Sequence, residues 1–179
     1  MFFENSRRNI SPKAAAEIIH ELPPFVSKVG VFVNPTNEFV RATIGENGID
    51  TLQFHGEETP PFCAQFGLKV IKAFQIKDRE SLRDCLNYRD CAWLLDSHVE
   101  GARGGTGVAF NWDLALEATK HSRMIVLAGG LRVETVTEAV RRVRPYAVDV
   151  SSGVESAPGR KDHSKLRDFI AAAKSVSCQ

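Results

Sequence analysis

Six short runs of apolar and β-branched residues, separated by stretches with helical periodicity, constrain the fold of this chain more than any other feature. Near-continuous apolar runs of this length are typical of strands buried on both faces of a parallel sheet. The runs recur roughly every 20 residues, and only the interval from Leu95 to Leu127 is much longer. The predicted strands are residues 29–33, 51–54, 69–73, 92–95, 124–127 and 147–150, and residues 1–3 could end a further strand.

The stretches between these runs have the spacing of amphipathic helices. Ser11 and Pro12 suit the N-cap and the first position of one helix, and the other predicted helices are residues 78–86, 112–119, 133–143 and 164–176. Alternation of strand and helix predicts repeated βαβ units with right-handed crossovers. The fold class is therefore α/β, either a doubly wound open sheet or a (β/α)8 barrel. Since no linker or change of composition interrupts the chain, we expect one domain over residues 1–179.

Composition excludes several classes of partner. The net charge is +1, from 23 Lys+Arg against 22 Asp+Glu, which gives no electrostatic basis for binding nucleic acid or an anionic membrane. No apolar run approaches the ~20 residues that span a bilayer, and the first residues do not resemble a signal peptide. The four cysteines form neither a CxxC pair nor a zinc-type pattern. We expect a soluble, cytoplasmic protein with reduced thiols and no metal site.

Glycines and serines follow the last two predicted strands. Gly129 and Gly130 come after the fifth run, and Ser151, Ser152 and Gly153 come after the sixth. Glycine allows the backbone to approach an anion, and barrels frequently bind phosphate with the loops after their last two strands. The order of these loops predicts a phosphate site, although each loop could also be an ordinary turn.

Other polar residues at strand ends have more than one interpretation. Asp96 could act as a general acid or base, or it could cap the next turn. His55 has no further ligands at metal-binding spacing, which favours a ligand-facing or structural imidazole. Arg8 could stay solvated beside Arg7 or bind a carboxylate through two parallel hydrogen bonds. The glycine-rich residues 101–107 could form a mobile lid or a second anion cradle.

Several stretches, in this order, resemble the phosphoribosylanthranilate isomerase family of tryptophan biosynthesis. The blocks Leu-Gln-Phe-His-Gly-Glu-Glu at residues 52–58 and Asp-Val-Ser-Ser-Gly-Val-Glu at residues 149–155 are highly specific, and their joint occurrence is more specific still. The resemblance covers essentially the whole chain. The other matching stretches are residues 6–12, 29–34, 94–97, 104–112, 128–131 and 158–162.

The resemblance implies a TIM (β/α)8 barrel of the phosphate-binding type that catalyses an Amadori rearrangement. Its substrate is a small-molecule phosphosugar, N-(5-phosphoribosyl)anthranilate, and the product is 1-(2-carboxyphenylamino)-1-deoxyribulose 5-phosphate. The reaction uses no cofactor and no metal. The resemblance implies neither a nucleic-acid nor a membrane partner, and we expect a monomer or a homodimer.

The resemblance also assigns roles to individual residues. Asp96 is similar to the general acid that protonates the ribose ring oxygen, and Arg8 to the residue that pairs with the anthranilate carboxylate. The remaining positions are His55 and Asp149, which line the substrate site, and Gly129, Gly130, Ser151 and Ser152, which hold the phosphate.

One part of the family pattern does not occur in this sequence. The family's first strand ends Lys-(Ile/Phe)-Cys-Gly, and its cysteine is the general base that removes the C2′ proton. None of Cys63, Cys85, Cys91 and Cys178 matches that position. We therefore expect an N-terminally truncated chain that lacks the first strand, the first helix and most of the second strand.

Two other functions are considered beside the isomerase. An inactive phosphosugar-binding fragment without the catalytic base is the alternative from a different class. Indole-glycerol-phosphate synthase, another phosphosugar barrel enzyme, would require a catalytic lysine pattern that the sequence does not show.

Overall fold

The computed structural model describes residues 1–97 and 112–176 of the chain. It divides into two compact units, Met1–Ala73 and Phe74–Gln179, called here the first and the second unit. The expectation of one domain over residues 1–179 stays a prediction. The glycine-rich residues 101–107 and Cys178 lie outside the described residues.

The first unit alternates strands and helices as the spacing of apolar runs predicts. The strands pair in parallel, with Gln53 opposite Val31 of one neighbour and Ile71 of the other. Phe2 forms an isolated parallel bridge to Phe32, as expected if residues 1–3 end a further strand. The elements are α1 (Pro12–His20), β1 (Val29–Phe32), α2 (Asn37–Asn47), β2 (Thr51–Phe54), α3 (Pro60–Ala64) and β3 (Lys69–Ile76), whose last residues belong to the second unit.

Polar side chains begin the three helices of the first unit. Ser11, Thr36 and Thr59 each accept a hydrogen bond from the backbone N–H three residues later, which satisfies a donor that the helix leaves unpaired. Pro12 follows Ser11 at the first helical position, as predicted. Gly48 ends α2 in the left-handed conformation, with φ 63°. These caps determine where each strand-to-helix loop ends.

Phenylalanine rings form the core of the first unit. Phe32 of β1 stacks on Phe2 at 5.3 Å between ring centroids and lies 6.1 Å from Phe54 of β2. Phe54 in turn meets Phe62 of α3 edge-on at 5.6 Å, and both strand rings are fully buried. Aromatic pairs at these distances add to the stability gained from burial. Ile18 of α1 does not join this core, since it is 57% exposed.

Asp50 lies directly before β2 and ties it to the chain before β1. Its carboxylate accepts hydrogen bonds from Ser27 Oγ at 2.5 Å, the Lys28 backbone N–H at 3.0 Å and Thr51 Oγ1 at 2.9 Å. The Lys28 ammonium forms an ion pair with it at 3.2 Å. Burial raises the pKa of Asp50, but these hydrogen bonds outweigh burial and hold the pKa well below its ordinary value.

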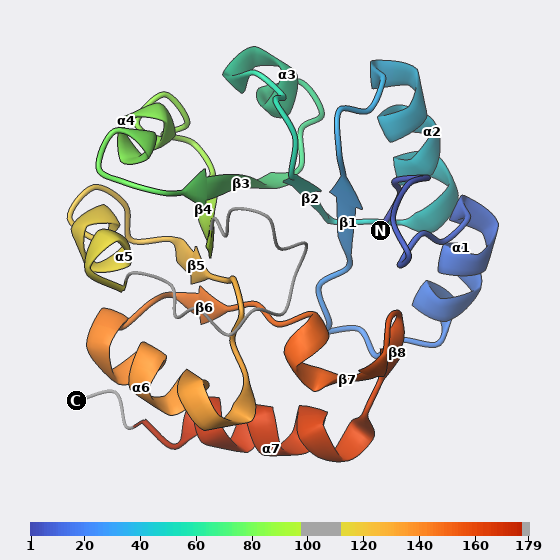
Figure 1. Cartoon of the computed structure of the whole chain (residues 1–179). Coiled ribbons are helices and arrows are strands. Elements are labelled where there is room, and N and C mark those ends of the chain that lie inside the picture. The colour runs from blue at the N-terminus through green and yellow to red at the C-terminus, as the bar shows by residue number, and fades with distance from the viewer. Residues whose placement is uncertain (98–111, 177–179) are drawn as a thin grey trace. The chain divides into compact units, whose positions relative to one another are not determined.

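The second unit continues the same alternation. Leu95 of β4 pairs with Leu127 of β5, and Leu127 pairs with Val148 of β6, all in parallel. Figure 1 shows α4, α5 and α6 on one side of these strands. The elements are α4 (Ser81–Cys85), β4 (Ala92–Ser97), α5 (Trp112–Ala118), β5 (Ile125–Leu127), α6 (Val133–Val143), β6 (Ala147–Val148), the 3-10 turn η1 (Ser152–Val154), β7 (Glu155–Ala157), β8 (Arg160–Lys161) and α7 (His163–Lys174).

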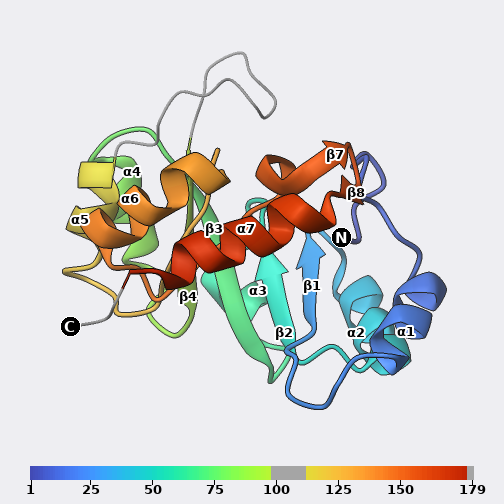
Figure 2. The same ribbon diagram turned by 90° about the horizontal axis from the view of Figure 1, so that it is seen from below.

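Aliphatic side chains from β4, β5 and α6 build the core of the second unit. Leu95, Leu127 and Val136 are fully buried. The helix α7 packs along α6, and Thr137 Oγ1 donates to the Ala172 carbonyl at 3.1 Å (Figure 2). The α6 bounds are those predicted from its apolar spacing, since Val136, Ala139 and Val143 are its buried residues.

The structure corrects several sequence-based expectations. The strand β3 is longer than predicted and β6 is shorter, while α2 and the β7–β8 hairpin were not predicted. Cys63, Cys85 and Cys91 are buried, as expected of small core residues. Among the described residues, no helix is long and apolar enough to cross a membrane.

Candidate functional site

The strands of the second unit bring three predicted site positions to one edge. The Ala128 N–H donates to the Leu95 carbonyl at 2.9 Å, and the Asp149 N–H donates to the Leu127 carbonyl at 2.8 Å. Because the strands are parallel and in this register, Asp96, Gly129 and Asp149 follow at the same carboxyl edge. Asp96 is half-buried and Asp149 is exposed. This edge is where barrels of this type gather their functional residues.

Two loops at this edge are in backbone contact: the glycine loop (residues 129–131) and the serine loop (residues 151–153). A Cβ atom added at Gly153 would lie 2.0 Å from the Leu131 carbonyl oxygen, so only glycine allows this approach. Gly129 and Gly130 have φ values of 81° and 67°, a conformation that glycine adopts without strain. The structure therefore places the two loops next to each other, as a phosphate site shared by both loops requires.

A lysine from the β7–β8 hairpin supports the serine loop. Lys161 Nζ donates to the Ser151 carbonyl at 2.8 Å and to Glu155 Oε1 at 3.1 Å. The Glu155 side chain is 5% exposed, so this carboxylate holds the ammonium from a buried position. No role for Lys161 was predicted from the sequence. The signal was its place in the matching stretch at residues 158–162, close behind the predicted phosphate loop.

The other two predicted site residues lie in the first unit. His55 directly follows β2 and is half-buried. Its backbone N–H donates to the Phe32 carbonyl at 2.9 Å. Its Nδ1 lies 3.4 Å from Gln53 Nε2. Arg8 is half-buried in the loop after the Phe2 bridge, where its N–H donates to Ser6 Oγ at 3.1 Å. Arg8 is thus less exposed than a fully solvated surface arginine would be.

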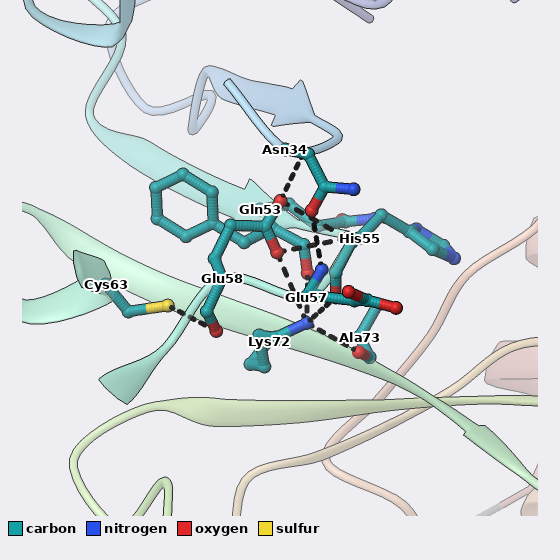
Figure 3. Close-up of polar contacts among 10 residues, drawn as sticks. Asn34, Gln53, His55, Glu57, Glu58, Cys63, Lys72 and Ala73 are labelled. Carbon is teal, nitrogen blue, oxygen red and sulfur yellow. Dashed lines mark hydrogen bonds and ion pairs between the residues drawn. The ribbon is translucent and has the colours of Figure 1, made fainter. Parts of the chain in front are cut away.

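A buried ion pair that sequence analysis missed lies beneath the loop that carries His55 (Figure 3). Lys72 Nζ is 3.4 Å from Glu58 Oε2, and the two side chains are 3% and 2% exposed. The available signal was Lys72 itself, a charge inside the apolar run of β3, because a charge on a buried strand requires a partner. Among the described residues, no group of three or more His, Cys, Asp or Glu side chains could hold a metal ion.

Comparison with known proteins decides the family. The family model described as PRAI, N-(5'phosphoribosyl)anthranilate (PRA) isomerase, matches residues 1–172. The chain belongs to the phosphoribosylanthranilate isomerase family. The N-(5'-phosphoribosyl)anthranilate isomerase of Citrifermentans bemidjiense is 51% identical over 177 residues, which cover 99% of this chain and 85% of that relative.

Solved phosphoribosylanthranilate isomerases have the same fold. One, in complex with reduced 1-(o-carboxyphenylamino)-1-deoxyribulose 5-phosphate, has a TM-score of 0.88 and 41% identity, covering 98% of this chain and 85% of that chain. Another, described as mutually generated monomers of the dimeric enzyme from Thermotoga maritima, has a TM-score of 0.86 and 38% identity, with the same coverage. Dimeric and monomeric forms thus both occur among the relatives.

These matches confirm the α/β class, the TIM-barrel fold and membership of an isomerase family of tryptophan biosynthesis. They extend over 98–99% of this chain and give no support to the expected N-terminal truncation, which stays a prediction. The roles of the individual site residues also stay predictions.

Proposed function

We propose that this chain acts on N-(5-phosphoribosyl)anthranilate and catalyses its Amadori rearrangement to 1-(2-carboxyphenylamino)-1-deoxyribulose 5-phosphate. Beyond family membership, one observation carries the proposal: the backbone contact between the glycine loop and the serine loop, with the Gly153 Cβ position 2.0 Å from the Leu131 carbonyl oxygen. Both loops lie at the carboxyl edge of β5 and β6. A sugar phosphate is the anion that such a pair of loops suits.

The phosphate would be held by Gly129, Gly130, Ser151 and Ser152. Gly130, Ser151 and Ser152 are exposed, so an anion can reach their backbones and hydroxyls. Glycine at residues 129 and 130 lets the phosphate oxygens approach the peptide groups closely. Lys161 holds the Ser151 carbonyl, which limits movement of the serine loop.

Asp96 would be the general acid, a catalytic residue that protonates the ribose ring oxygen and opens the ring. Its half-buried place at the end of β4 supports this role, because it lies at the same strand edge as the glycine loop. Transfer of a proton by a positioned acid contributes roughly 10²–10⁴ in rate. Asp149, exposed at the same edge, would line the ribose side of the substrate.

Arg8 and His55 would contact the anthranilate part of the substrate. A guanidinium offers two parallel N–H donors that match a carboxylate, which makes Arg8 the partner for the anthranilate carboxylate. The polar His55 side chain would line the site of the same substrate. Both side chains are half-buried, as expected of residues that face a ligand from a folded loop.

A second function, binding of the phosphosugar without turnover, is favoured by one observation. The described cysteines are all buried, which suits packing better than proton transfer.

A binding assay and a turnover assay on the same preparation distinguish the two functions. Calorimetric titration with the reduced product analogue measures binding, and loss of substrate fluorescence measures turnover. Binding together with turnover supports the isomerase, and binding alone supports the second function. Absence of both from a folded sample would contradict either proposal. Growth of an isomerase-deficient tryptophan auxotroph expressing this chain gives an independent test of turnover.

We further propose a cytoplasmic monomer or homodimer. An exposed apolar segment favours the dimer: Phe25 is 100% exposed and Val26 and Val29 are 41% and 43% exposed. Apolar side chains gathered in one exposed segment are typical of interaction surfaces. Light scattering after size-exclusion chromatography would give the mass in solution.

A further inference from the structure

Three side chains hold the two peptide groups that follow His55 (Figure 3). The Gly56 N–H donates to both carboxylate oxygens of Glu58, at 3.0 and 3.2 Å. Lys72 Nζ donates to the Gly56 carbonyl at 2.6 Å. The next N–H, that of Glu57, donates to Asn34 Oδ1 at 2.7 Å. Side-chain hydrogen bonds therefore hold both of the peptide groups that directly follow His55.

The same carboxylate reaches the loop after β1. Glu58 Oε1 accepts a hydrogen bond from the Asn34 N–H at 2.7 Å. Asn34 has φ 47°, a left-handed conformation that asparagine adopts more readily than most residues with a side chain. A Cβ atom at Gly56 would lie 2.2 Å from Asn34 Oδ1, so the two loops touch. Glu58 thus connects the loops after β1 and β2.

Lys72 supplies the charge that this buried carboxylate requires. Besides the Gly56 carbonyl, its Nζ donates to the Ala73 carbonyl at 3.1 Å and lies 3.4 Å from Glu58 Oε2. Burying two charges is unfavourable unless hydrogen bonds satisfy them, and a well-packed apolar pair would often be equally stable. Stability alone therefore does not require a charged pair at these positions.

We propose that the buried Glu58–Lys72 pair is a positioning pair that places His55 for substrate binding by fixing the loops after β1 and β2. Neither side chain is assigned a contact with substrate; both act through the peptide groups of Gly56 and Asn34. The inference rests on the proposed function, in which His55 faces the substrate.

Four variants separate positioning from stability: Lys72→Met, Glu58→Gln, the double variant, and Lys120→Met as a matched control. Lys120 forms an ion pair with Glu117 at 3.0 Å, but its side chain is 64% exposed and it belongs to the second unit. Lys72→Met leaves a buried carboxylate without its ammonium. The double variant removes both charges and restores stability without restoring the hydrogen bond to the Gly56 carbonyl.

Two readouts are measured on each variant: the imidazole NMR signals and the affinity for the reduced product analogue. The chain has five histidines, and His55→Gln identifies the His55 signal. In Lys72→Met and in the double variant, we expect the His55 signal to move and the affinity to fall roughly 10- to 100-fold, because loss of a hydrogen bond to a charged ligand group costs about that much. Lys120→Met should change neither.

A merely structural pair would give a different pattern. Wild-type affinity and an unmoved His55 signal in the double variant would overturn the proposal, as would recovery of affinity in step with stability. If Lys72→Met does not fold, the double variant and Glu58→Gln carry the test. If the wild-type chain does not bind the analogue, the proposed function fails, whereas the NMR signal still shows whether the pair positions His55.

Discussion

Replacing Gly153 by alanine tests the contact between the glycine loop and the serine loop. The added Cβ would start 2.0 Å from the Leu131 carbonyl oxygen, and real Cβ contacts are essentially never shorter than 3.0 Å, so the loops must separate by about 1 Å. The obstacle is backbone, and it cannot rotate away as a flexible side chain would. Added volume in a well-packed site typically costs about 1–3 kcal/mol of folding free energy.

The effect on the phosphate site should exceed the effect on folding. Loss of a hydrogen bond to a charged phosphate costs about 1.5–3 kcal/mol, and a loss of about 2.7 kcal/mol raises the dissociation constant 10²-fold. Calorimetric titration of Gly153→Ala with the reduced product analogue, well below its melting temperature, should therefore show a dissociation constant roughly 10²-fold above that of the wild type.

Gly45→Ala is the matched control. Gly45 lies in α2, and a Cβ there would meet nothing within 4 Å. Alanine at this position should stabilise the helix by about 0.5–1 kcal/mol and leave analogue affinity unchanged. If Gly153→Ala folds and binds the analogue within about twofold of wild type, the contact between the loops does not hold the phosphate, and the reasoning is refuted.

Three other changes test other parts of the structure. Asp96→Asn should lower turnover roughly 10²–10⁴-fold while analogue affinity stays within a few-fold, and equal losses of both would contradict a role as general acid. Gly56→Ala would place its Cβ 2.2 Å from the Asn34 amide oxygen and should cost about 1–3 kcal/mol in urea unfolding; an unchanged midpoint would show that the two loops separate freely. The pKa of Asp50 is lowered in the fold, so its contribution to stability is fully present above the unfolded pKa of about 3.9 and is lost progressively as pH falls from there through the folded pKa. Because this side chain is 40% exposed, Asp50→Asn should remove only about 1 kcal/mol at pH 7 and less than that at pH 2, and an equal loss at both would refute the pH argument.

Local sequence signals were sufficient to predict a helix where each residue acts on its own neighbours along the chain. Ser11 and Pro12 begin α1, because a serine hydroxyl can cap the first turn and a proline ring suits the first helical position of any helix. The spacing of Val136 and Val143 predicted the bounds of α6, since its apolar stripe meets the core without interruption. In α2 the buried positions include Thr43 and Asn47, whose side chains donate to backbone carbonyls of the same helix. The apolar pattern is therefore broken there, and the helix was missed.

By itself, the sequence determined the order of strands and helices and the positions where glycine and polar residues follow strand ends. These depend on spacing and on backbone conformation, which are properties of neighbouring residues. Only the tertiary structure decided that Gly153 touches the Leu131 carbonyl and that Glu58 joins Asn34, Gly56 and Lys72. Such contacts arise when parallel strands bring together loops that are distant along the chain, and local residue patterns do not specify which backbone groups then meet.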